Sequence, residues 1–225
     1  SFSESTLYFL PGVHNITNMP ACCVTDDLSA SCPCTYVNTS WPGYVSRFEL
    51  QSGKTYYLPS DAWLNGAFTS SATSTLTGTR LIGYGHISGH LYRWKLPYAN
   101  VGGLNTHMVN DTHIIGPMFV DFNNHNVIIP GSVSRTDPLC TDPACIATKN
   151  TLRHIKTLGW RTNSDGVHVW GHWNEISDLF LRTNDDSMYI GGEASPNTWR
   201  RITIWNDANG APFVFAQAPA EIGTQ

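Results

Sequence analysis

Short apolar runs alternate with polar segments rich in Asn, Gly, Asp and Pro along the chain. No stretch shows the three- and four-residue spacing of an amphipathic helix with a cap at each end. Strands are expected where the apolar runs fall, at residues 7–10, 55–58, 80–82, 113–115, 127–129, 154–158, 176–181 and 202–205. The pattern therefore predicts an all-β protein.

Three of these runs resemble one another, because each places an isoleucine after two polar residues. They contain Ile155, Ile176 and Ile202, at spacings of 21 and 26 residues. Such a period is too long for a hairpin but suits a solenoid whose turns each contribute short strands. A sandwich is the competing architecture, but its strands recur every 8 to 12 residues or so. The spacing favours a parallel β-helix.

Cysteines and low charge point to an extracellular chain. Four cysteines precede residue 50 and two follow it, and their even number suggests disulfides: Cys22, Cys23, Cys32, Cys34, Cys140 and Cys145. Three Asn-x-Ser/Thr sequons, at Asn15, Asn38 and Asn110, agree with glycosylation during secretion. We expect residues 1–50 to form a Cys-rich N-terminal cap or first coil, and residues 51–225 the β-helix domain.

Composition excludes two classes of partner. Charged residues make up 13% of the chain and the formal net charge is −4, with no Lys/Arg block to bind nucleic acid or an anionic membrane. No apolar run approaches the roughly 20 residues that cross a bilayer. We expect a secreted protein with neither nucleic acid nor membrane as partner.

Carboxylates occur in two turn-like segments that lie about one repeat apart. Residues 162–166 contain Asp165, and residues 183–187 contain Asp185 and Asp186. Successive turns of a β-solenoid stack at about 4.8 Å, so the three side chains should crowd one face. Crowded carboxylates cannot all ionise easily, and one that keeps a proton can serve as the general acid of glycoside hydrolysis. The simpler interpretation is that Asn-Asp-Asp and Ser-Asp-Gly are ordinary turns.

Several motifs, taken together and in order, resemble glycoside hydrolase family 49, which contains dextranases and isopullulanase. They span roughly residues 55 to 215 and comprise residues 55–68, the Gly-rich turn 83–89, Trp160–Gly166, Ile176–Phe180, Asn184–Asp186 and Arg201–Trp205. The resemblance implies a right-handed parallel β-helix of the pectate-lyase type. It also implies an inverting hydrolase in which Asp185 is the general acid, while Asp165 and Asp186 hold the attacking water as general base.

The chain departs from the family pattern at three places. One extra residue lies between Asp165 and Asp185, Tyr189 stands where the family has a lysine, and Asn209-Gly210-Ala211-Pro212 replaces an Asn-Asp-Pro. These differences bear on substrate choice. We expect an α-glucan such as dextran or pullulan as the polysaccharide partner.

Four further side chains near the aspartates are candidates for substrate binding: Trp170, Trp173, His168 and Tyr189. Aromatic rings can stack on sugars, although in a β-rich chain they more often belong to the core. His168 and His172 have the spacing of a metal-ligand pair only on a helix, and this segment is strand and turn. We therefore expect no metal and no cofactor.

A non-catalytic role is the alternative function. The chain stops shortly after residues 213–215 without a capping helix, so the β-helix is expected to be truncated or open at that end. An open end could support self-association into a glycosylated extracellular filament, or the chain could be a carbohydrate-binding scaffold.

Overall fold

The computed structural model describes residues 6–16, 47–70, 74–90, 102–106, 109–122, 125–129, 149–191 and 196–215. Every regular element in these ranges is a β-strand, and the sheets are parallel, so the predicted all-β class is confirmed. A search of the same ranges finds no helix that could span a membrane.

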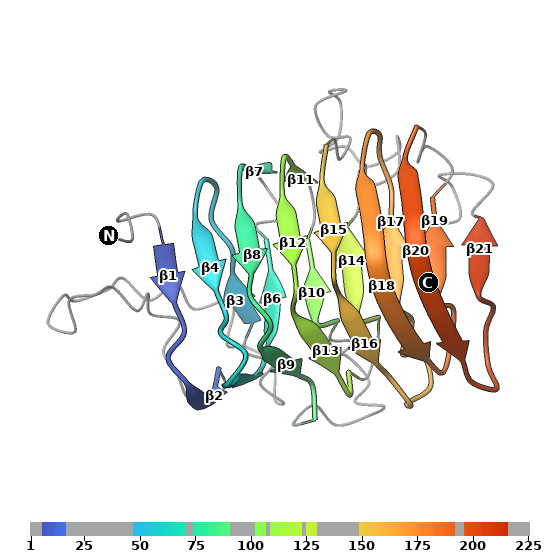
Figure 1. The fold of residues 1–225 in the computed structure, drawn as a ribbon, viewed down its shortest axis with the longest axis horizontal. Helices are drawn as coiled ribbons and strands as arrows, with labels where there is room; N and C mark the ends of the chain where they lie inside the picture. The colour runs from blue at the N-terminus through green and yellow to red at the C-terminus, as the bar shows by residue number, and fades with distance from the viewer. Residues whose placement is uncertain are drawn as a thin grey trace, which may run out of the picture.

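The strands form the faces of a stack of coils, with labels as in Figure 1. The first face contains the first strand of each coil: β1 (Thr6–Tyr8), β4 (Thr55–Tyr57), β8 (Arg80–Ile82), β12 (His113–Ile115) and β15 (Thr151–Arg153). The second face contains the next strand: β2 (Gly12–Asn15), β5 (Ala62–Asn65), β9 (His86–Ser88), β13 (Met118–Val120) and β16 (Lys156–Leu158). Two long strands, β18 (Glu175–Thr183) and β20 (Thr198–Asn206), run through both faces and join them into one sheet.

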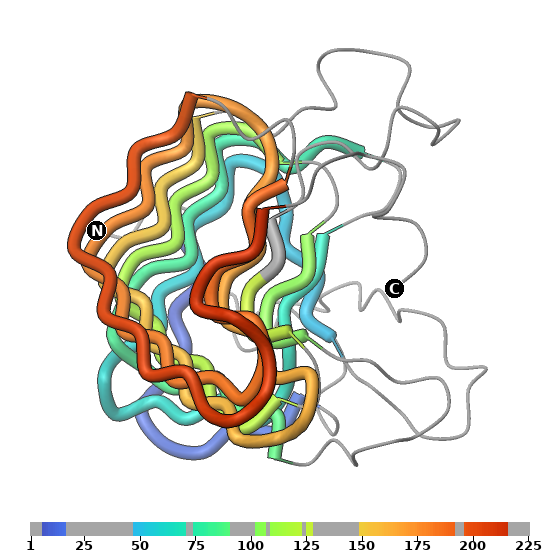
Figure 2. The backbone as a smooth tube through the Cα atoms, turned by 90° about the vertical axis from the view of Figure 1, so that its right-hand side faces the viewer, coloured from blue at the N-terminus to red at the C-terminus, as the bar shows by residue number. Residues whose placement is uncertain are grey.

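A third face closes each coil. Its strands are β3 (Arg47–Glu49), β6 (Ala67–Thr69), β10 (Leu104–Asn105), β14 (Val127–Ile129), β17 (Val167–Val169), β19 (Met188–Ile190) and β21 (Phe213–Phe215). A separate pair, β7 (Leu76–Thr77) and β11 (Val109–Asn110), lies beside the stack. Viewed nearly along the stack, successive coils follow one another closely (Figure 2). This is a β-helix-like arrangement of parallel strands.

Inward side chains form ladders that run from coil to coil. On the first face Leu81, Ile114, Leu152 and Ile176 occupy one register position and are at most 1% exposed. On the third face an equivalent buried ladder contains Phe68, Leu104, Val127, Val167 and Met188. Burying one such side chain contributes about 1.5–3 kcal/mol, so each coil is stabilised chiefly by the coils next to it.

The eight expected strands all occur in the structure, but the register of the repeat differs from the prediction. Ile176 stacks on Leu152 and Trp199, whereas Ile155 belongs to a different ladder, with Leu179 and Ile202. The similar local sequences around the three isoleucines therefore do not mark equivalent positions. The reason is that β18 and β20 pass through two faces without a break, so one strand contains two register positions for isoleucine.

The described parts of residues 1–50 continue the stack. β1, β2 and β3 pair in parallel with β4, β5 and β6. Asn15 lies in β2, where its side-chain oxygen accepts a hydrogen bond from Asn65, and Asn110 lies half-buried in β11. The third sequon, Asn38, and the six cysteines Cys22, Cys23, Cys32, Cys34, Cys140 and Cys145 lie outside the described residues.

Candidate active site

Asp165, Asp185 and Asp186 occupy equivalent turns of two successive coils. Asp165 lies between β16 and β17, while Asp185 and Asp186 lie between β18 and β19. The two turns are joined by backbone hydrogen bonds, since the Gly166 N–H donates to the Asp186 carbonyl at 2.9 Å. The structure thus stacks one aspartate against the adjacent pair.

Local sequence explains how these turns form. Asn163 adopts the left-handed conformation, with φ of 61°, which asparagine tolerates better than most residues. The Thr183 hydroxyl donates to the Asp185 carbonyl at 2.9 Å and lies 2.7 Å from the Ser187 hydroxyl. Gly166 sits so close to the next coil that a Cβ there would be 2.2 Å from the Ser187 carbonyl oxygen. Polar turn residues and one glycine therefore set the close approach of the aspartates.

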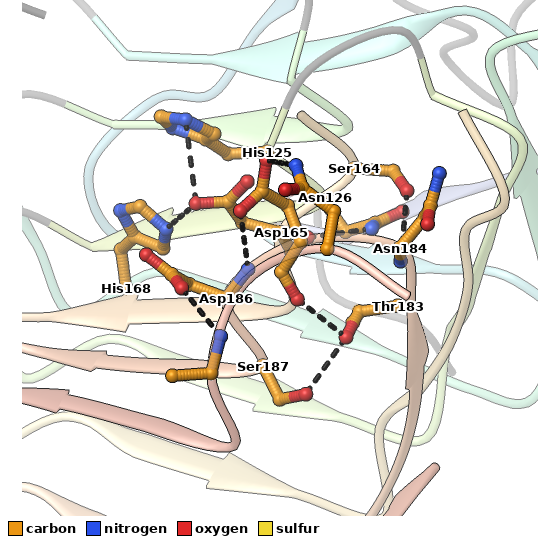
Figure 3. A network of polar contacts seen from close by, with 12 residues as sticks. His125, Asn126, Ser164, Asp165, His168, Thr183, Asn184, Asp186 and Ser187 are labelled. Carbon is orange, nitrogen blue, oxygen red and sulfur yellow. Dashed lines mark hydrogen bonds and ion pairs between the residues drawn. The ribbon is translucent and has the colours of Figure 1, made fainter. Parts of the chain in front are cut away.

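Asp165 is buried and lies against two histidines, His168 in β17 and His125 just before β14 (Figure 3). Its Oδ2 lies 2.8 Å from Nε2 of His168 and 3.6 Å from Nε2 of His125. Its backbone carbonyl accepts hydrogen bonds from the Asn126 side chain at 2.7 Å and from the Asn126 N–H at 2.9 Å. Both the carboxyl group and the backbone of Asp165 are thereby fixed.

Burial dominates the protonation of this group. It raises the pKa of Asp165 from 3.8 to about 7, His125 opposes the rise, and the charges of Asp185 and Asp186 add to it. Burial also lowers the pKa of His125 to about 4 and that of His168 to about 3. Near neutral pH the histidines are uncharged, and the aspartate is the group that gains or loses a proton.

Asp185 and Asp186 are half-buried and more accessible than Asp165. Oδ1 of Asp185 accepts a hydrogen bond from the Asp186 N–H at 3.0 Å, and Oδ2 accepts one from the Asn209 side chain at 2.8 Å. Oδ1 of Asp186 accepts from the Ala211 N–H at 2.8 Å. Burial and then repulsion by Asp186 raise the pKa of Asp185, while the hydrogen bonds act in the opposite direction.

His125, Asp165 and His168 are the residue types of a transition-metal site, and their ligand atoms lie within 4.8 Å of one another. In the structure the Nε2 atoms of both histidines face the same carboxylate oxygen, Oδ2 of Asp165. The two imidazole rings are stacked, with centroids 4.2 Å apart and planes 25° apart.

The predicted substrate-binding residues fall into two groups. His168 is 5% exposed, stacked between His125 and Tyr189, and Trp170 is 7% exposed and packs against both His168 and Tyr189. These two rings are covered by protein and offer no face to a sugar. Tyr189 is half-buried and Trp173 is 59% exposed, but Trp173 lies at the opposite end of β17 from Asp165.

Three residues of the site were not predicted from the sequence as parts of it: His125, Asn126 and Asn206. Asn206 donates from its side chain to the Asp185 carbonyl at 2.8 Å. His125 and Asn126 precede β14, one coil before Asp165, and Asn209, noted above only as a departure from the family pattern, follows β20, one coil after Asp185. These residues could have been found by counting one coil back from Asp165 and one coil forward from Asp185.

Comparison with known proteins supports the fold. No family model matches the chain, and no curated protein matches its sequence. Among solved structures, Dex49A from Penicillium minioluteum, a family 49 dextranase, matches with a TM-score of 0.57 and 19% identity over 90% of this chain and 32% of its own. A protein from Parabacteroides merdae, provisionally assigned as a glycosyl hydrolase, matches with a TM-score of 0.53 and 12% identity over 72% of this chain and 78% of its own.

At these identities the likeness concerns the fold. The chain spans about a third of the length of Dex49A. Over most of its length the chain has the fold of these two proteins. One of them, Dex49A, belongs to the family that the sequence motifs resemble.

Proposed function

We propose that this chain is the β-helix part of a secreted glycoside hydrolase that cleaves an α-glucan, such as dextran or pullulan, with inversion on a right-handed coil. The proposal rests on one observation. The turn that holds Asp165 is stacked on the turn that holds Asp185 and Asp186 in the next coil, and burial, together with the charges of that pair, raises the pKa of Asp165 to about 7. Such a group of carboxyls supplies both a protonated and an ionised member near neutral pH.

Asp185 is the proposed general acid. It is half-exposed, so it can contact the glycosidic oxygen of a bound glucan. Its raised pKa keeps the proton on the carboxyl to higher pH than an ordinary aspartate would. Protonation of the leaving oxygen by Asp185 then allows the bond to the anomeric carbon to break.

Asp165 and Asp186 are the proposed base, holding the water that attacks the anomeric carbon. A carboxylate with a pKa of about 7 binds a proton more strongly than one with the ordinary 3.8, and so is a better base once ionised. Because Asp185 and Asp186 contribute to that pKa, the three groups titrate as a coupled set. A bell-shaped dependence of activity on pH is expected.

His125 and His168 keep Asp165 in place for this role. In its Nε2–H form, neutral His168 can donate to Oδ2 of the ionised carboxylate at 2.8 Å. The His168 ring is fixed because it stacks on His125 on one side and on Tyr189 on the other. The histidines therefore orient one oxygen of Asp165 and leave the other for the water.

The structural neighbours support this choice of reaction. Dex49A is a dextranase and the Parabacteroides merdae protein is provisionally assigned as a glycosyl hydrolase. The motifs by which this sequence resembles family 49 contain Asp165, Asp185 and Asp186. The 225-residue chain spans about a third of the length of Dex49A. The proposal includes that this chain is active by itself.

The test is release of reducing sugar from dextran, pullulan and polygalacturonate by the wild type, Asp185→Asn and Asp178→Asn. Asp178 is the matched control, because it lies in β18 and bonds Arg201 at 2.9 Å, away from the site. We expect release from at least one glucan, a loss of at least about a hundredfold in Asp185→Asn, and wild-type release in the control. The first anomer released should be β, as followed by proton NMR.

No release from either glucan by folded wild type, or equal release by Asp185→Asn, would contradict the proposal. A retained α-anomer would contradict inversion alone. Regular filaments together with no release from any of the three substrates would favour the non-catalytic alternative.

A further inference from the structure

The turn after β20 reaches back one coil to both members of the aspartate pair. The Asn209 side chain donates to Oδ2 of Asp185, and the Ala211 N–H donates to Oδ1 of Asp186, each at 2.8 Å. The same turn is tied to the segment that leads into β19 of the preceding coil, because the Ser187 N–H donates to the Ala211 carbonyl at 2.9 Å. One short segment of a third coil thus contacts both carboxylates.

Gly210 allows this close approach. It has φ of +73°, and a Cβ there would lie 2.4 Å from the Asp185 carbonyl carbon and from the Asp186 nitrogen. The Asn206 side-chain amide also donates to the Asp185 carbonyl at 2.8 Å. These contacts fix the backbone around Asn209, so the position of its side chain relative to Asp185 is set by the fold.

An asparagine amide suits a carboxyl group that changes protonation state. Its NH2 group donates to Oδ2 when the carboxyl is ionised. It can still donate to a lone pair of Oδ2 when that oxygen carries the proton, so the O–H stays available for the glycosidic oxygen. Asn209 is exposed, unlike the histidines around Asp165, so it lies where a glucan chain could reach. It can keep Oδ2 of Asp185 in one direction both before and after proton transfer.

We propose that Asn209 is a positioning residue that orients Oδ2 of Asp185 toward the glycosidic oxygen. This inference rests on the proposed role of Asp185 as general acid. Asn209 contacts the acid from the coil that follows it, so the reacting groups are assembled from three successive coils rather than two.

The groups that face Asp185 predict the direction of the effect on pH dependence. They are the carboxylates of Asp186 and Asp165, the backbone N–H groups of Asp186 and Asn163, and the Asn209 amide. Asn209→Ala removes a donor to the charged form, so the pKa of Asp185 should rise. Asn209→Asp adds a negative charge at the same distance, so the pKa should rise further.

The experiment measures kcat, KM and the pH profile of glucan hydrolysis for the wild type, Asn209→Ala and Asn209→Asp. Ala208→Ser, at an exposed neighbouring position, is the control. We expect a fall in kcat of about tenfold in Asn209→Ala with little change in KM. The alkaline limb should move up by roughly half to one pH unit in Asn209→Ala and further in Asn209→Asp.

A carboxyl titration of Asp185 by carbon-13 NMR on the same variants separates this inference from the proposed function. If the wild type does not hydrolyse a glucan but Asn209→Ala raises the pKa of Asp185, the contact is supported and the hydrolase proposal fails. If Asn209→Ala leaves the pKa of Asp185 and the alkaline limb unchanged, the inference is overturned, whatever happens to thermal stability or kcat.

Discussion

Asp165 and His168 are buried and His125 is half-buried beside them, and burial moves the pKa of the aspartate and the pKa values of the histidines in opposite directions. Burial raises the pKa of Asp165 to about 7, so the folded protein binds this proton more tightly. It lowers the pKa of His125 to about 4 and that of His168 to about 3. At neutral pH burial therefore leaves Asp165 as the titrating group, beside two uncharged histidines. That group is the one proposed to act as base.

These pKa values predict how stability depends on pH. The raised pKa of Asp165 contributes stability that is present below 3.8 and lost as pH rises through about 7. The lowered pKa values of the histidines contribute stability that is present above 6.5 and lost as pH falls toward about 4 and about 3. Between about pH 4 and 6.5, unfolding of this cluster should release one proton and take up two.

His168→Gln keeps an amide donor for Asp165 but removes one of the two protons taken up. The free energy of unfolding should therefore rise less steeply with pH in this variant than in the wild type, by about 1.4 kcal/mol per pH unit. Urea unfolding between pH 4.5 and 6.5 measures both slopes. Equal slopes would mean that His168 is charged in the folded protein and that its burial has been misjudged.

Residue types in the sequence were enough to find the three aspartates but not their partners. Asp165, Asp185 and Asp186 lie in recognisable turn motifs one repeat apart. His125 and Asn209 lie about 40 and 24 residues from the aspartates they contact, in segments without a motif of their own. Rings predicted to bind sugar, those of His168 and Trp170, are buried because they pack on each other.

The elements that matter most for the site are turns. Asp165, Asp185 and Asn209 all lie in the turns that lead into the third face, at equivalent places in three coils. Each turn is held to the next through backbone groups, as between Gly166 and Asp186. A change in one turn should therefore disturb the site more than a change in the length of a strand.

Gly166→Ala tests this dependence on turn spacing. The added methyl would lie 2.2 Å from the Ser187 carbonyl oxygen, so the two turns must separate. We expect a loss of about 3 kcal/mol or more in unfolding free energy, together with loss of activity. The measurement is urea unfolding of Gly166→Ala, with Gly53→Ala as the control.

Gly53 has φ of +72°, a left-handed conformation that Gly166 does not adopt, and it has open space around it. Its substitution should cost only about 1 kcal/mol, the strain of the left-handed backbone alone. If both variants lose the same stability, the contact between the Asp165 and Asp185 turns is not tight.

Strands were easier to predict than their register. Arg80–Ile82, His113–Ile115 and Val127–Ile129 occur as β8, β12 and β14 with the expected bounds. Most of the other strands were not predicted, among them β7, β10 and β11, because a run of two or three residues has no detectable alternation. The register failed where β18 and β20 each pass through two faces, since local likeness between isoleucine motifs does not reveal which face each occupies.

At the scale of the whole molecule, the fold turns a linear spacing of about 20 residues into side-by-side contact. Parallel pairing of each strand with its counterpart on the next coil brings turns from four coils together, from His125 to Asn209. Sequence periodicity could predict this stacking for residues 151 onward. It could not do so for residues 109–150, where a long connection separates β14 from β15.

The central claim is that Asp165 and the Asp185–Asp186 pair form one electrostatically coupled group across two coils. The most direct measurement is the pKa of Asp165, followed by carbon-13 NMR of its carboxyl group in the wild type and in Asp185→Asn, with Asp178→Asn as control. The account predicts a value of about 7 in the wild type and the control, and a lower value in Asp185→Asn. An Asp165 pKa near 3.8, or one that Asp185→Asn leaves unchanged, would contradict it.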